Sequence, residues 1–192
     1  MPTHRKITLL LASTFLLPAV AFADAGVPML FVVMPVFGFS LVPIVLIEAL
    51  YLQKSLALTF GHAIRGSLLA NAVSTLVGIP LTWIGLVVLE ATTGGGRAYG
   101  LGSLLGRVGA VTWQAPWLIP YESNLHWMIP VAGTVLLVPF FFVSWWIEYL
   151  ICVTRFTSVS PVAVRRAVRD ANLITYGLLL FWPAAFYLMT PA

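Results

Sequence analysis

Two glutamates in strongly apolar surroundings are the residues of this sequence best suited to chemistry. Glu48 lies in the run IEAL at residues 47–50, and Glu148 lies in the similar run IEYL at residues 147–150. A charged side chain at the centre of a membrane helix costs roughly 2.5–3.5 kcal/mol, and less near an interface. Such residues therefore face protein or trapped water and find partners, so the two carboxyl groups mark where function should be sought first.

Arginine and asparagine follow both glutamates in the same order. Each arginine lies 17 residues after its glutamate (65 − 48 and 165 − 148). With one inserted residue after the arginine, Asn71 matches Asn172, and a threonine follows at positions 75 and 175. Rare polar residues in one order favour an internal duplication over a chance resemblance between apolar segments. We expect two helical hairpins of the same orientation, related by an axis along the membrane normal.

These residues predict one intramembrane polar cluster with two interpretations. Its six members are Glu48, Arg65, Asn71, Glu148, Arg165 and Asn172. In the structural interpretation, which is the simpler expectation, each glutamate pairs with an arginine (Arg165 or Arg166 in the second hairpin) and an asparagine of its own hairpin. In the functional interpretation, the two carboxylates face each other and carry a proton, a cation or a basic substrate group.

The elements that position these residues must be membrane helices. The chain has 192 residues, of which 60% are hydrophobic and 8% charged, with a mean hydropathy of +1.00. Soluble domains carry roughly 25% charged residues, so this chain could not cover a water-facing surface. Apolar runs of membrane-spanning length predict four spans at about residues 28–52, 67–89, 127–153 and 173–189 of a single transmembrane helical domain over residues 24–192. Prolines within the spans are expected to kink the helices rather than break them.

The N-terminus predicts a cleavable signal peptide over residues 1–23. A basic start at residues 4–6 and an apolar stretch at 7–17 precede the small-residue pattern AFA at 21–23. The alternative is an uncleaved first helix. A signal peptide leaves the mature N-terminus outside the cytoplasm. With that orientation, the first inner loop holds two basic residues, the second holds four, and the outer loop of residues 91–126 holds two. This distribution obeys the positive-inside rule. The prediction is a bacterial inner (cytoplasmic) membrane protein with both mature termini on the periplasmic side.

The outer loop is rich in aromatic residues. It contains the segment WQAPWLIPY at residues 113–121, after a mildly amphipathic stretch at 101–111. Tryptophan and tyrosine prefer the headgroup layer, so we expect the loop to lie along the outer leaflet. A re-entrant loop or a lid over a site between the helices is the alternative.

The sequence carries no motif that names a reaction. It has no HExxH, no G-x-S-x-G and no phosphate-binding loop, only one cysteine, and three scattered histidines. We therefore predict no enzyme, no cofactor and no metal site. The net charge of +4 is attributed to membrane topology rather than to nucleic-acid binding.

The function predicted from the sequence is a non-enzymatic subunit or scaffold of a membrane assembly. Its partners would be the lipid bilayer and either another protein or further copies of the chain. The alternative is a small dimeric transporter or channel that uses Glu48 and Glu148.

Overall fold

The protein is an all-helical, multi-pass membrane protein in the part of the chain that the structure describes. The computed structural model describes residues 27–93, 102–113 and 125–189. Its helices are α2 (Val27–Leu56), α3 (Phe60–Thr93), α4 (Leu104–Trp113), α5 (Leu125–Arg155), α6 (Pro161–Leu179) and α7 (Phe181–Met189). Four helical segments are long and apolar enough to cross a membrane: α2 from Gly38, α3, α5 from His126, and α6 together with α7. The predicted number of spans thus agrees with four helical segments of sufficient length and hydropathy, whereas the predicted signal peptide lies outside the described residues.

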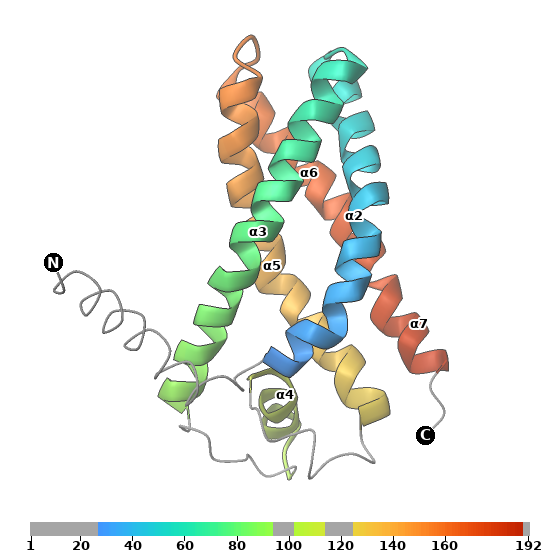
Figure 1. Cartoon of the computed structure of the whole chain (residues 1–192), viewed down its shortest axis with the longest axis vertical. Helices are drawn as coiled ribbons and strands as arrows, with labels where there is room; N and C mark the ends of the chain where they lie inside the picture. Colours follow the sequence, from blue (N-terminus) through green and yellow to red (C-terminus); the bar gives the residue numbers. More distant parts are fainter. Residues whose placement is uncertain (1–26, 94–101, 114–124, 190–192) are drawn as a thin grey trace, which may run out of the picture.

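The four spans form two hairpins packed side by side. The turn at residues 57–59 joins α2 to α3, and the turn at 156–160 joins α5 to α6. Both turns lie at one end of the bundle, which we name the turn end, and α4 lies at the opposite end, the α4 end (Figure 1). Between the hairpins, α3 packs against α5 and α2 against α6.

Two helices begin earlier than hydropathy predicted, and a local cap accounts for this in α6. The spans were expected from residues 67 and 173, but α3 begins at Phe60 and α6 at Pro161. Ser160 caps α6 by accepting a hydrogen bond from the backbone N–H of Ala163 at 3.3 Å, and proline follows at the first helical position. A capped helix continues through polar turns outside the hydrocarbon layer, which a hydropathy scan does not register.

The last span has a kink at its proline, as predicted. Helices α3 and α5 continue through Pro80, Pro130 and Pro139, whereas α6 ends at Leu179 and α7 begins at Phe181. Pro183 has no N–H to donate to the carbonyl group of Leu179, so the helical ladder lacks a bond at this point. Leu180 keeps right-handed helical angles (φ −63°, ψ −22°), and α6 and α7 together form one span.

Helix α4 packs onto the spans at the α4 end. The indole N–H of Trp113 donates to the hydroxyl of Thr93 at 3.2 Å. The ring packs against an apolar cluster of α3 and α5 that includes Leu86 and Met128. Most of the aromatic segment at 113–121 lies outside the described residues, so its position at the membrane surface stays a prediction.

Candidate functional site

Glu48 of α2 and Glu148 of α5 come together in the interior of the bundle. Their side chains are 2% and 3% exposed, and the two carboxyl groups lie within interaction distance of one another. We name these two side chains the carboxyl pair. They lie on different hairpins, so the packing of one hairpin against the other creates the pair.

An asparagine of the same hairpin donates to each carboxyl group. The side-chain amide of Asn71 donates to Oε2 of Glu48 at 2.6 Å. In the second hairpin, the amide of Asn172 donates to Oε2 of Glu148 at 2.7 Å. Both contacts run from the second helix of a hairpin to its first helix, at the same position in the two hairpins.

Hydroxyl groups cross between the hairpins to the remaining carboxyl oxygens. Thr175 of α6 donates to Oε1 of Glu48 at 2.8 Å, and Ser74 of α3 donates to Oε1 of Glu148 at 3.0 Å. Each of the four carboxyl oxygens therefore accepts a hydrogen bond from an uncharged donor, and each carboxyl group ties the two hairpins together.

The arginines of the predicted cluster do not join it. Neither Arg65 nor Arg165 forms an ion pair with a member of the carboxyl pair, and both side chains are exposed on the bundle surface. The guanidinium group of Arg165 lies over the ring of Trp145, 5.5 Å from its centroid. The predicted Glu–Asn contacts are present, whereas the predicted Glu–Arg pairs are wrong, and Arg166, the alternative to Arg165, is exposed as well. A guanidinium group at the surface keeps its contact with water or headgroups, which burial would remove.

The second helices of the two hairpins share one pattern of burial. Each buried residue of α6 has a number 101 higher than a buried residue of α3 (for example 164 − 63 = 101). The α3 residues are Ala63, Gly66, Ser67, Ala70, Asn71, Ser74 and Gly78, and the α6 residues are Val164, Ala167, Val168, Ala171, Asn172, Thr175 and Leu179. This offset already holds at the helix starts, 60 and 161. The extra residue therefore precedes α6 instead of following Arg165, because an insertion inside a helix would rotate every later side chain by about 100°.

This offset identifies the site residue that the sequence comparison missed. Thr175 had been matched with Thr75, but its structural counterpart is Ser74. Ser74 lies three residues after Asn71, as Thr175 lies three residues after Asn172. The two asparagines are 101 positions apart (172 − 71). The same difference subtracted from 175 gives position 74, so the sequence alone could have identified Ser74.

A cavity of about 70 Å³ leads away from the carboxyl pair. Its walls include Leu41, Ile44, Ile79, Phe140 and Leu179, together with Tyr176, whose hydroxyl donates to Ser144 at 2.8 Å. In each of the four spans, these wall residues lie closer to the α4 end than the carboxyl pair and the two asparagines do. The cavity therefore extends towards the α4 end and not towards the turns.

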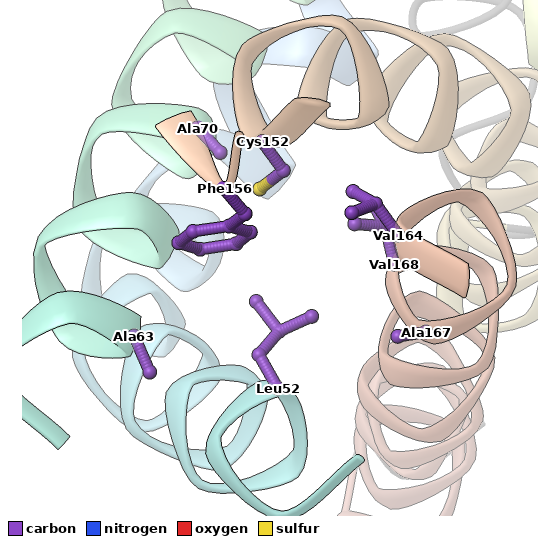
Figure 2. Packing of buried hydrophobic residues seen from close by; sticks show 8 residues of the cluster. All are labelled: Leu52, Ala63, Ala70, Cys152, Phe156, Val164, Ala167 and Val168. Atoms are coloured by element: carbon purple, nitrogen blue, oxygen red, sulfur yellow. The ribbon is translucent and has the colours of Figure 1, made fainter. Parts of the chain in front are cut away.

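An apolar cluster closes the opposite side of the carboxyl pair. We name it the plug; its members are Leu52, Ala63, Ala70, Cys152, Phe156, Val164, Ala167 and Val168. Figure 2 shows the ring of Phe156 among side chains from all four spans, with Leu52 and Val164 beside it. Phe156 is completely buried, and its ring packs directly against Gly66. The plug separates the carboxyl pair from the turn end.

The two histidines of the described residues take part in aromatic contacts. His62 meets the ring of Phe156 edge-on at 5.3 Å, and His126 stacks on Tyr187 at 6.3 Å. Within residues 27–93, 102–113 and 125–189, no group of three or more His, Cys, Asp or Glu side chains converges as a metal site would require.

Comparison with known proteins found no family model, no curated protein and no solved structure that matches this chain. Function must therefore be argued from the geometry of the site.

Proposed function

We propose that the protein is a small proton-coupled membrane carrier in which Glu48 and Glu148 share a bound proton. The observation that supports this is a pair of buried carboxyl groups in contact, surrounded by neutral donors and not paired with an arginine. Two like charges at one site in a medium of low polarity repel each other strongly, so one group ionises and the other keeps its proton. A proton between the two groups also satisfies both without moving the four donors.

The one-sided cavity favours a carrier over an open channel. The cavity extends from the carboxyl pair towards the α4 end, while the plug fills the interior on the side of the turn end. A carrier exposes its site to the two sides of the membrane alternately. In this proposal the plug is the barrier that must open for release at the turn end. One chain supplies both carboxyl groups, so a second copy is not needed to complete the pair.

We also propose the orientation and origin predicted from the sequence: a bacterial inner-membrane protein, made with a signal peptide, whose α4 end faces the periplasm. Six basic residues support this because they lie near the turn end: Lys54, Arg65, Arg155, Arg165, Arg166 and Arg169. The two hairpins are proposed to be copies, which the common offset of their buried positions supports. An alkaline phosphatase fusion at the C-terminus should be active, and a fusion in the turn at 156–160 inactive.

A structural role has support from the same hydrogen bonds. Two asparagines and two hydroxyls hold the hairpins together through the carboxyl pair, as a non-enzymatic subunit or scaffold would require. In that case the pair contributes to stability only, and proton binding has no consequence that can be measured across the membrane.

Two measurements on the reconstituted full chain separate these functions. Infrared spectroscopy in lipid nanodiscs should show the C=O band of a protonated carboxyl group at neutral pH. A pH jump applied to vesicles on a solid-supported membrane should give a transient current, because the proton moves into the membrane to reach its site. Both signals should disappear in the double variant Glu48→Gln, Glu148→Gln. They should persist in Asp170→Asn, which makes the same acid-to-amide change at a residue paired with Arg169 outside the site.

Glutamine keeps the size of glutamate. Its carbonyl oxygen can accept the bond from Asn71, and its amide N–H can donate to the hydroxyl of Thr175, which then accepts instead of donating, so the double variant is expected to fold. A wild-type protein without the band, or with no current above that of empty vesicles, would overturn the carrier and leave the scaffold.

A further inference from the structure

We infer that the cavity binds a small organic cation with N–H donors, of the guanidinium or primary ammonium class, in exchange for the shared proton. This inference rests on the proposed function and adds the chemical class of the transported substrate. It follows from the charge, the walls and the size of the site.

The carboxyl pair favours a ligand that is positively charged and donates hydrogen bonds. Loss of the shared proton leaves two carboxylates without a cation beside them. Each carboxylate oxygen accepts one bond from a neutral donor and has a second lone pair that can accept another. A ligand with several N–H groups supplies both the positive charge and donors for these oxygens.

The walls suit an organic cation better than a metal ion. Phe140 and Tyr176 place aromatic rings along the cavity, and Leu41, Ile44 and Leu179 add apolar surface. Aromatic faces attract ammonium and guanidinium groups, and guanidinium also stacks on them. A hard metal ion binds through oxygen ligands alone and would gain nothing from these rings, although hydroxyl groups also line the cavity.

The size of the cavity excludes large substrates. Sites for drug-sized molecules have volumes of roughly 300–1,000 Å³, whereas this cavity has about 70 Å³. On the same scale a water molecule needs about 10–15 Å³, so the cavity has room for only a few non-hydrogen atoms. Guanidinium and methylammonium are of this size.

The exchange conserves charge at the site. When the cation enters from the α4 end, the proton shared by the carboxyl pair leaves to water, so one positive charge replaces another and no covalent bond other than O–H breaks. The site cannot hold the proton and the cation at the same time. Movement of protons across the membrane in one direction therefore drives movement of the cation in the other direction, so the carrier acts as an antiporter.

Three probes of matched shape or charge test the ligand class. Guanidinium carries the charge and the donors, urea has the same planar shape and donors without the charge, and tetramethylammonium has the charge without N–H donors. Calorimetry on the wild-type protein in nanodiscs, with a pH-indicator dye in weak buffer, measures binding and proton release together. Millimolar guanidinium should bind and release close to one proton per bound ion, while urea and tetramethylammonium should do neither.

Two variants place the binding at the cavity. The double variant Glu48→Gln, Glu148→Gln should neither bind guanidinium nor release a proton, and Asp170→Asn should behave as the wild type. Gly78→Val adds a side chain to the cavity wall at a position where the nearest atom to the new Cβ is Cγ1 of Val143 at 3.6 Å, an ordinary contact. This variant should keep the protonated-carboxyl band but bind guanidinium at least tenfold more weakly.

The outcomes distinguish failure of the ligand from failure of the proposed function. Equal binding of guanidinium and tetramethylammonium, no binding of guanidinium, or full binding in Gly78→Val would overturn the ligand class, and the proton site would stand if the infrared band is present. Absence of the band from the wild type would overturn the proposed function itself.

Discussion

Replacing Gly66 by alanine tests the tight packing of the plug. A Cβ atom at this position would lie 2.8 Å from Cε1 of Phe156 and closer still to Cζ. The ring is completely buried and held by side chains from all four spans, so it cannot swing away as the end of a flexible chain could. Overpacking of this kind costs about 1–3 kcal/mol.

A matched glycine of the same helix isolates that cost. Gly85 also lies in α3, and nothing lies within 4 Å of a Cβ built there. Both substitutions remove a helical glycine, which gains about 0.5–1 kcal/mol. The difference between Gly66→Ala and Gly85→Ala therefore reports the clash alone, and we expect Gly66→Ala to be the less stable variant by about 1–3 kcal/mol.

A double-mutant cycle connects the clash to its partner. In a Phe156→Leu background the ring is gone, so Gly66→Ala should lose its penalty and behave like Gly85→Ala. The cost of Phe156→Leu by itself cancels in the cycle. The free energy of unfolding can be measured by titrating mixed micelles with dodecyl sulfate and following tryptophan fluorescence. If Gly66→Ala cost the same in both backgrounds, within the usual additivity error of about 0.5 kcal/mol, the packing described for the plug would be wrong.

Two further predictions concern the crossed hydroxyls and the plug. Thr175→Val and Ser74→Ala each leave one carboxyl oxygen without its donor, so each should cost about 1–3 kcal/mol of unfolding free energy; a cost confined to one of them would contradict the equivalence of the hairpins. Cys152, the single cysteine of the chain, is 1% exposed in the plug, so a membrane-impermeant maleimide should label it at least tenfold faster in Phe156→Ala than in the wild type. Equal labelling rates, read by mass spectrometry, would show that Phe156 does not seal this side.

The local properties of the chain determined the four spans and the depth of the polar residues. Backbone N–H and C=O groups in lipid must be satisfied within their own segment, so a long apolar run becomes a helix whatever surrounds it. Within each hairpin, the sequence could pair the glutamate with the asparagine, because the two residues lie at similar distances from the turn and therefore at similar depth. These pairs are Glu48 with Asn71 and Glu148 with Asn172. These inferences need only hydropathy, helix geometry and the order of residues along the chain.

Tertiary packing alone decided what the glutamates contact. Depth along a helix does not fix its rotation, so the sequence predicts both Arg65 and Asn71 as partners of Glu48, and only the helix faces leave Asn71 alone of the two in contact with it. The crossed bonds from Ser74 and Thr175 depend on how one hairpin packs against the other. The plug depends on four helices meeting at one level.

The carboxyl pair shows where the two kinds of information divide. The sequence placed two acids within the membrane, because the apolar runs around them left no other place. Whether those acids would be neutralised separately by arginine or brought into contact was a matter of how the helices rotate and pack. The structure sets them against each other with neutral donors on every oxygen, which turns two isolated polar residues into one site.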